Sequence, residues 1–455
     1  MEINELLNLQ REYYSTFETF EYNFKIEQLK KLKQSIQDNQ DILLQAFKDD
    51  LNKCEFDAVT TEISLVYNEI NYMLKHLKKL MTPKRVSTSL LNFPSKGRII
   101  SEPLGQILIM SPWNYPFQLA ICPLVGAIAG GNTIILKASA YTPNVSNAIA
   151  KILSVFDEKY IAVVLGGRDK NQELLDQKFD LIFFTGSKSV GQLVQEKASK
   201  HLTPVILELG GKSPCIVSNT ADIDKSAKRI VWGKFLNAGQ TCIAPDYIIV
   251  HIDIYNEFID KVKEYTQNFY YTDEKLNDNF MYIVNDKHTE RLLGLIDSNK
   301  LVWGGKSSGR QIEPTILRDV EFSDAIMQEE IFGPLMPIIP YEDIDDVIKY
   351  INSNDKPLAL YYFGDKKEFE KVITYTPSGG ACHNEVIMHF TEKNLPFGGV
   401  GESGMGSYHG KKSFETFTHS KSVLCKAKKM ELPLKYPPYT DKKSNFVYKY
   451  LGYKK

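Results

Sequence analysis

The stretch "DLIFFTGSKSVG" (residues 180–191) passes from an apolar run through a Thr-Gly-Ser turn into a segment of helical character. A short apolar run of this kind is typical of a buried strand, and we expect a helix to begin near Ser189 with Gly191 in its first turn. Backbone N–H groups at such a helix start can hold a phosphate, and Ser187 can donate one more hydrogen bond. Because the G-x-G-x-x-G pattern is absent, a purely steric reason for Gly186 and Ser187 stays an equal alternative.

The same alternation of apolar runs and helical segments continues on both sides of this stretch. The other runs are "QILIM" (106–110), "NTIILK" (132–137), "YIAVVLG" (160–166) and "PVILELGG" (204–211). Strands that alternate with helices predict an α/β fold whose doubly wound, Rossmann-like parallel sheet carries helices on both faces. Such sheets bind ligands beyond the carboxyl ends of their strands.

The pattern divides the chain into three parts. Polar, helix-period segments up to about residue 82 and the sheet form a first domain, residues 1–207. The segments "YIIVHI", "DIDDVIKYIN" and "LALYYFG" predict a second α/β domain over residues 208–410. Residues 411–455 form a C-terminal segment that ends in a basic, aromatic tail, since nine lysines and two acidic residues lie between residues 426 and 455.

The composition excludes several classes of protein. With 55 basic and 56 acidic residues the charges balance, so no overall field favours nucleic acid as a partner. No apolar run reaches the roughly 18 residues of a membrane-spanning helix, and the polar start "MEINELLNLQREYY" is not a signal peptide. We therefore expect a cytoplasmic protein without a transmembrane segment, in which the basic tail is the candidate for peripheral membrane contact.

The cysteines and histidines favour neither metal binding nor disulfides. The six cysteines include no C-x-x-C pair, and the eight histidines form no H-E-x-x-H or similar ligand spacing. We expect reduced thiols and no metal site.

Three polar positions interrupt the apolar pattern at places where chemistry can occur. Asn114 in "SPWNYP" follows the first strand, Glu208 ends the fifth, and Cys242 lies in "KFLNAGQTCIAP". Each has a structural alternative, because free cysteines are usually buried and a buried acid can belong to an ion pair. Together, a thiolate that attacks a carbonyl, an amide that binds the oxyanion and a carboxylate that later activates water form a chemically complete set. With a nicotinamide that removes a hydride between those steps, the set describes aldehyde oxidation through a thioester.

Over nearly its whole length the sequence resembles the aldehyde dehydrogenase superfamily. The resemblance rests on "PWNYP", "FTGSKSVG", "LELGGKSP", "NAGQTC", "EEIFGP" and "LPFGGVGESGMG", in the order and spacing of the family. The segments "CIAPDY", "KPLALY" and "GMGSYHGKKSFETFTH" make it most similar to the class 3 branch, which acts on aromatic and medium- to long-chain aliphatic aldehydes. The resemblance implies a small-molecule aldehyde substrate and NAD or NADP as cofactor.

The resemblance also implies roles for individual residues. Cys242 becomes the nucleophile, Glu208 the general base, and Asn114, with the Cys242 amide, the oxyanion hole. The implied cofactor site comprises Trp113, Lys137, Gly186, Ser187, Gly191, Glu330 and Phe332. The implied substrate tunnel comprises Tyr67, Tyr115, Trp232, Leu236, Phe390 and Phe397, which can equally be core residues, and Cys382 is expected beside it.

One departure from the family pattern bears on the cofactor. Relatives commonly read K-P-S-E where this chain reads "KASA", so the glutamate that engages the adenosine ribose is replaced by Ala140. Loss of a carboxylate that would repel a 2′-phosphate, with Lys137 retained, predicts that NADP is used as well as NAD.

The resemblance also implies a homodimer, because "NFPSKGRIISEPLG" and the tail resemble elements that pair across family dimers; we expect an oligomerisation hairpin near residues 88–106.

Two other functions stay open. The chain can be a catalytically silent NAD-binding protein, or a thiol esterase that hydrolyses an acyl-cysteine without a cofactor. An aldehyde-dependent NAD(P)H assay separates both from a dehydrogenase.

Overall fold

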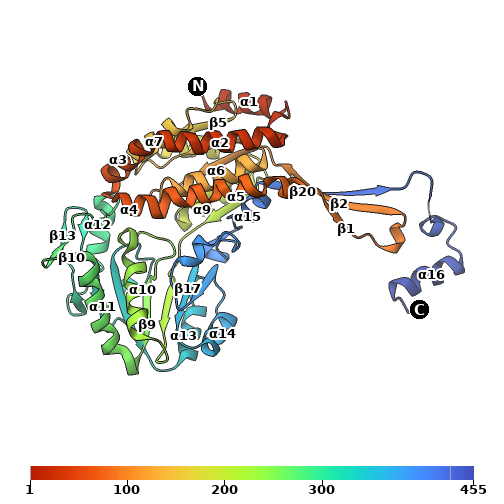
Figure 1. Ribbon diagram of the computed structural model, residues 1–455. Coiled ribbons are helices and arrows are strands. Elements are labelled where there is room, and N and C mark those ends of the chain that lie inside the picture. The colour runs from red at the N-terminus through yellow and green to blue at the C-terminus, as the bar shows by residue number, and fades with distance from the viewer. Residues whose placement is uncertain (1, 431, 455) are drawn as a thin grey trace.

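Two large sheets and a three-stranded sheet organise the molecule, and the described residues also form two two-stranded sheets (Figure 1). The structure is a computed structural model, and it describes residues 2–430 and 432–454. The chain begins with helices that lie over the first sheet, namely α1 (Ile3–Tyr14), α2 (Tyr22–Asp38), α3 (Gln40–Leu51), α4 (Glu55–Ala58) and α5 (Ser64–Met81). Ile63 and, on α5, Val66, Ile70, Met73 and Leu77 are buried, so they form the apolar face of this helix.

The first large sheet confirms the predicted strands. It has six strands in the order β19-β7-β6-β3-β4-β5, and its five main strands run parallel. These are β3 (Gln106–Met110), β4 (Thr133–Lys137), β5 (Ile161–Val164), β6 (Leu181–Thr185) and β7 (Val205–Glu208). The connecting helices are α6 (Gln118–Gly130), α7 (Pro143–Leu153), α8 (Arg168–Leu175) and α9 (Lys188–Ser199).

The sixth strand is one that the sequence pattern does not predict. β19 (Gly404–Met405) comes from the glycine-rich segment near the end of the chain and pairs antiparallel with β7, with Gly404 opposite Glu208. Gly404 has φ 144°, and a Cβ there would lie 2.1 Å from the Leu207 carbonyl oxygen. Close approach of two backbones therefore requires glycine, a residue that depresses strand propensity, at this position.

The second large sheet has seven strands in the order β12-β15-β16-β9-β8-β17-β18, all parallel to their neighbours except β12. The strands are β8 (Pro214–Val217), β9 (Tyr247–His251), β12 (Leu301–Trp303), β15 (Thr315–Leu317), β16 (Leu335–Tyr341), β17 (Ala359–Phe363) and β18 (Gly380–His383). The associated helices are α10 (Ile223–Phe235), α11 (Tyr255–Tyr270), α12 (Asp286–Leu293), α13 (Ile344–Asn352) and α14 (Lys366–Tyr375). The predicted boundary at residues 207–208 falls inside β7, and the next strand, β8, lies in the second sheet.

A three-stranded arm extends away from the body (Figure 1). It consists of β1 (Lys84–Val86), β2 (Ser95–Pro103) and β20 (Thr418–Lys426), paired antiparallel, and β20 follows α15 (Lys411–Thr416). The tail beyond it carries the exposed helix α16 (Asp441–Leu451). Among residues 2–430 and 432–454, no helix has both the length and the apolar character needed to cross a bilayer.

Candidate active site

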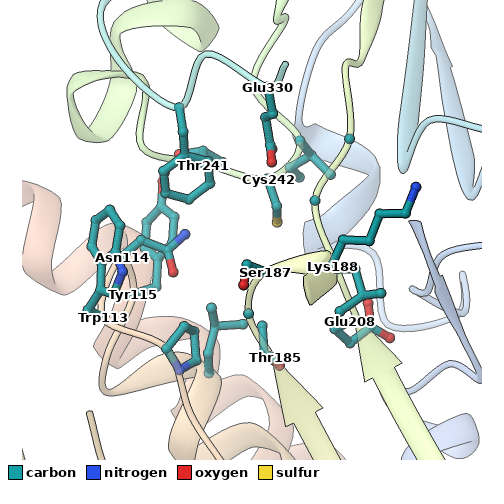
Figure 2. A pocket seen from close by; sticks show the side chains of 18 of the residues that line it. Trp113, Asn114, Tyr115, Thr185, Ser187, Lys188, Glu208, Thr241, Cys242 and Glu330 are labelled. Atoms are coloured by element: carbon teal, nitrogen blue, oxygen red, sulfur yellow. The ribbon is translucent and has the colours of Figure 1, made fainter. Parts of the chain in front are cut away.

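A cavity of about 1520 Å³ opens at the carboxyl ends of β3, β4, β6 and β7 and reaches residues that surround the second sheet. It brings together the residues singled out from the sequence except Gly191, Tyr67 and Cys382. The lining includes Trp113, Asn114, Tyr115, Lys137, Gly186, Ser187, Glu208, Trp232, Leu236, Cys242, Glu330, Phe332, Phe390 and Phe397. Figure 2 shows the side chains of Cys242, Glu330, Ser187 and Asn114 around one shared space.

The loop that carries Cys242 has an unusual backbone. Within the short helix η4 (Leu236–Gly239), Asn237, Ala238 and Gly239 have φ angles of 57°, 51° and 71°. Left-handed conformations cost free energy for residues with a Cβ, and they persist where the surroundings hold them. A Cβ at Gly239 would lie 2.2 Å from the Gly333 carbonyl oxygen, so only glycine fits. The cysteine is thus presented from a strained turn.

Gln240 holds this turn, a role that the sequence analysis did not assign. Its fully buried side chain donates to the carbonyls of Asn237 (3.2 Å) and Tyr282 (3.1 Å) and accepts from the Val284 amide (3.0 Å). Its position directly before Thr241 and Cys242 in "NAGQTC" was the available sign, but the type of residue alone does not reveal which groups it bonds.

Burial raises the pKa of the Cys242 thiol, and the carboxylates of Glu330 and Glu208 raise it further. The thiol is therefore protonated at neutral pH in this state of the site. A thiolate is the stronger nucleophile, so the site has to remove the proton during the reaction rather than store a thiolate beforehand.

Glu208 is a carboxylate without partners. It ends β7 and is 3% exposed, and neither of its carboxylate oxygens has a hydrogen-bond partner in the described part of the chain. Burial raises the pKa of Glu208 well above its ordinary value. A buried acid that serves only structure is expected to be paired. The absence of hydrogen-bond partners therefore favours a role for Glu208 in proton transfer.

Asn114 bridges the two loops that meet at the cavity. Its Nδ2 donates to the Gln240 carbonyl (3.0 Å), and its own backbone carbonyl accepts from Asn237 Nδ2 (3.0 Å). An amide nitrogen carries two hydrogens, so one remains for a ligand. The side chain is 4% exposed and lines the cavity, where a developing oxyanion would be poorly solvated without it.

The loop after β6 forms the start of α9, as the sequence predicts. Ser187 is the N-cap, and the Gly186 amide donates to the Glu208 carbonyl (3.0 Å). Gly191 does not line the cavity; a Cβ there would lie 2.7 Å from Leu209 Cδ2. Gly191 therefore serves the packing of α9 against Leu209, whereas Gly186 and Ser187 face the cavity.

Lys137 lies at the end of β4 with Ala140 beside it in the cavity wall. Its Nζ donates to the Ala138 carbonyl (2.7 Å), and burial lowers the pKa of Lys137 to about 8. No acidic side chain of the described residues pairs with it. A desolvated cation without a counter-ion is suited to an anionic ligand.

A second group of side chains lines the cavity near Glu330. The Trp113 and Phe332 rings meet edge to face with centroids 5.4 Å apart, and Phe332 has φ 51°. Burial and the nearby charge of Asp246 raise the pKa of Glu330 to about 8. Asp246 also accepts from the Ile331 amide (3.0 Å), which fixes the loop that carries both residues.

A further part of the lining is aromatic and aliphatic, and it includes residues that the sequence did not single out. Besides the predicted aromatic residues, it contains Phe56, Leu65, Leu119, Ile387 and Met388. Tyr67 does not line the cavity, and its hydroxyl is buried without a partner. Cys382 also lies outside the lining, with its Sγ 3.2 Å from His389 Nδ1. Helical periodicity predicts which face of a helix is buried, but it does not predict whether a buried side chain packs in the core or lines a cavity.

Comparison with known proteins gives a consistent result. A sequence profile of the Aldehyde dehydrogenase family matches residues 1–423. The chain is 44% identical over 426 residues to aldehyde dehydrogenase family 3 member A2 of Pongo abelii, covering 92% of this chain and 88% of the relative. It is 45% identical over 436 residues to 4,4'-diaponeurosporen-aldehyde dehydrogenase of Staphylococcus aureus, covering 94% and 95%. It is 43% identical over 442 residues to a dimeric, NADP-preferring aldehyde dehydrogenase of Mus musculus, covering 96% and 98%.

Solved structures show the same fold. The substrate-bound state of Staphylococcus aureus AldH matches with a TM-score of 0.97 at 43% identity, covering 99% of this chain and 100% of that one. The NAD+ complex of an aldehyde dehydrogenase from Bacillus cereus matches with a TM-score of 0.80 at 25% identity, covering 89% and 84%. The chain therefore belongs to the aldehyde dehydrogenase family, is most similar to its class 3 branch, and is an oxidoreductase that acts on aldehydes with NAD or NADP.

Proposed function

We propose that this protein oxidises apolar aldehydes, aromatic or of medium to long chain, to carboxylic acids through a thiohemiacetal and a thioester on Cys242. The observation that carries the proposal is the convergence of Cys242, Glu208 and Asn114 on one cavity with two unlike walls. One wall offers Lys137 and the helix start at Ser187, and the other is aromatic and aliphatic.

The first wall fits a dinucleotide. A buried lysine without a counter-ion and the N-terminus of the twelve-residue helix α9 both favour phosphate groups. We assign Lys137, Gly186 and Ser187 to the adenosine and phosphate portion, and Trp113, Glu330 and Phe332 to the nicotinamide ribose. When bound, the nicotinamide supplies an acceptor for the hydride that leaves the substrate carbon.

In the proposed mechanism, the Cys242 thiol gives its proton to water as its sulfur attacks the aldehyde carbon. The oxyanion that forms accepts hydrogen bonds from the free Nδ2 hydrogen of Asn114 and from the Cys242 backbone amide. After the thioester has formed, Glu208 takes a proton from water and the water oxygen bonds to the acyl carbon. The C–S bond then breaks, which releases the carboxylic acid and the Cys242 thiolate.

The apolar wall supports the substrate class. Each buried methylene contributes about 0.8 kcal/mol, so a long aliphatic chain gains affinity along this wall. One relative is named 4,4'-diaponeurosporen-aldehyde dehydrogenase, which supports an apolar aldehyde as the substrate. We expect kcat/KM to rise with chain length in a series of straight-chain aldehydes assayed with each cofactor; a preference for short, polar aldehydes would contradict the proposal.

The name of the dimeric murine relative and the antiparallel arm support a homodimer. Sedimentation of the purified protein tests this assembly. A strict dependence of turnover on NAD or NADP would, in the same preparations, remove an esterase as the main role.

Asn114→Ala should lower kcat by about 100- to 1,000-fold, the usual effect of losing one preorganised oxyanion donor. Steady-state assays measure this change, and KM should move little because the donor acts mainly on the developing charge. Asn114 also donates to the Gln240 carbonyl, so the effect of losing this hydrogen bond has to be separated from the effect of losing the oxyanion donor. Alkylation of Cys242 by iodoacetamide passes through no oxyanion, so its rate in Asn114→Ala should stay within a few-fold of the wild-type rate. A loss of kcat/KM that arises mainly from a higher KM would mean that Asn114 only orients the substrate.

Ala140→Glu should shift the ratio of kcat/KM for NAD over NADP toward NAD. The wild-type protein should use both cofactors, because Lys137 can pair with the 2′-phosphate and no carboxylate at position 140 repels it. The variant gains an acceptor for the 2′-hydroxyl and a repulsive charge. Ala140→Gln is the matched control, since it adds bulk and hydrogen bonding without charge. Exclusion of NADP by the wild type, or an unchanged ratio in Ala140→Glu, would refute this role.

The same preference should depend on pH. The lowered pKa of Lys137, about 8, means that its ammonium form is present below pH 8 and is lost as the pH rises through that value. The affinity for NADP relative to NAD should therefore fall above pH 8. Fluorescence titration at pH values from about 6.5 to about 9.5 measures this change. A flat ratio would exclude Lys137 as the partner of the 2′-phosphate.

A further inference from the structure

Two buried tyrosine hydroxyls bind the residues on either side of Cys242. The hydroxyls of Tyr115 and Thr241 lie 2.6 Å apart, and the Tyr361 hydroxyl donates to the Ile243 carbonyl at 2.6 Å. Figure 2 shows Tyr115 and Thr241 beside Cys242. The residue before the cysteine and the residue after it are thus each held by a different tyrosine.

The two tyrosines come from segments that belong to different sheets. Tyr115 belongs to the loop that links β3 to α6, in the first sheet, whereas Tyr361 lies in the middle of β17 in the second sheet. The loop of Cys242 therefore spans the junction between the two sheets and is bonded to both. A shift of either sheet relative to the other would act on the position of the thiol.

Tyr115 is itself fixed by a buried ion pair. The Lys53 Nζ lies 4.5 Å from the centre of the Tyr115 ring and 2.7 Å from the Glu62 carboxylate, and both charged side chains are buried. Glu62 also accepts from the Phe117 amide (2.9 Å) at the start of α6. A buried pair of this kind is costly to disturb, so it keeps the ring of Tyr115 in one orientation.

Tyr361 is fixed by the sheet. It is fully buried, and its backbone pairs with Cys215 of β8 on one side and Cys382 of β18 on the other. A central strand position of this kind leaves the side chain little freedom, and its hydroxyl reaches the Ile243 carbonyl from a defined point.

The loop between the two tyrosines needs such support. Three successive residues, Asn237 to Gly239, adopt left-handed conformations just before Thr241 and Cys242. Strain of this kind persists only when neighbouring groups hold the chain, and attack on a carbonyl carbon requires a separation of about 3 to 3.5 Å and a defined angle.

We propose that Tyr115 and Tyr361 are positioning residues that clamp Cys242 through Thr241 and Ile243, and we call these two contacts the tyrosine clamp. The inference rests on the proposed role of Cys242 as nucleophile. The tyrosines do not exchange protons with the substrate in this scheme; they fix where the sulfur stands relative to Asn114 and the bound aldehyde.

The clamp is tested with Tyr115→Phe and Tyr361→Phe, which remove only the hydroxyl. The matched control is Tyr255→Phe, because Tyr255 is also buried and its hydroxyl donates to the Ile338 carbonyl (3.1 Å) away from the cavity. Each clamp variant should lower kcat by about 10- to 100-fold with little change in KM, as expected for a misplaced reacting atom. The control should keep the wild-type kcat.

A second readout follows Cys242 without any aldehyde. The rate of its alkylation by iodoacetamide is measured against pH by mass spectrometry, with the exposed Cys425 as reference in the same sample. Because burial raises the pKa of the Cys242 thiol, release of the loop should move the midpoint of this profile to lower pH in the clamp variants and not in Tyr255→Phe. Wild-type kcat together with a wild-type alkylation profile, or equal changes in the control, would overturn the clamp.

Substitutions of Thr241 decide the matter if a tyrosine variant does not fold. Thr241→Val, which keeps the shape but lacks the hydroxyl, should reproduce Tyr115→Phe, and Thr241→Ser should restore most of the activity. The double variant with Tyr115→Phe should be no slower than either single variant, because both remove the same contact. Equal losses in Thr241→Val and Thr241→Ser would overturn the proposal. Full activity of Cys242→Ala would instead defeat the proposed function and leave the alkylation result standing.

Discussion

Replacement of Cys242 by alanine should reduce aldehyde oxidation by at least about 1,000-fold, because removal of a covalent nucleophile eliminates the thiohemiacetal and leaves only binding and electrostatic effects. Cys242 is not among the residues that we assign to the cofactor, so binding of NAD and NADP should persist. NAD(P)H formation measures the first effect, and quenching of the intrinsic tryptophan fluorescence measures the second.

Two comparisons make the Cys242 result specific. Cys425→Ala removes an exposed thiol on β20 and should keep the wild-type rate. Mass spectrometry of the wild-type protein quenched during turnover should find the acyl group on the peptide that contains Cys242. Oxidation by Cys242→Ala at more than a few per cent of the wild-type rate would sink the assignment.

Glu208→Gln should lower the steady-state rate by about 100-fold or more while leaving the first turnover intact, since an amide cannot take a proton from water. Stopped-flow measurement should therefore show a burst of about one NAD(P)H per active site, followed by slow turnover, as expected when hydrolysis of an acyl-enzyme becomes limiting. Hydroxylamine, which cleaves thioesters without a protein base, should restore turnover in the variant.

The pH dependence supplies an independent check on Glu208. Burial raises the pKa of this carboxyl group, so it is protonated at low pH and becomes a base only as the pH rises through the raised value. Hydrolysis of the acyl-enzyme by the wild type should thus accelerate with rising pH over that range, and Glu208→Gln should lose the rise. A variant with the wild-type steady-state rate would refute the assignment, and loss of the burst would move Glu208 to the acylation step.

Much of the first sheet could be predicted from local pattern. Strands β3 to β7 are apolar on both faces, so their residues read as continuous runs, and glycine, proline and polar residues mark where each run ends. Position at the end of a strand also placed Asn114 and Glu208 at the cavity, because parallel strands present their carboxyl ends on one edge. The motifs, together with their spacing, identified the family and the candidate nucleophile.

The tertiary structure decided features that depend on contacts between distant segments. The pairing of Gly404 with Glu208, the bonds of Gln240 and the hydroxyl contacts of Tyr115 and Tyr361 join residues that no local period relates. These contacts form because residues that are far apart in the sequence lie close together in the folded chain, and hydrophobic periodicity does not predict which residues these are.

The sequence by itself determined the type of fold, because hydrophobic period is a local property that each segment of the chain displays on its own, and its motifs identified the family. Only the tertiary structure decided that Gly191 packs α9 rather than facing the cavity, that Tyr67 lies outside the lining, and that burial makes the Cys242 thiol harder to ionise. The physical reason is the same in each case: cavities, desolvation and hydrogen bonds are produced by the surfaces that meet when the two sheets pack, and they exist only after folding.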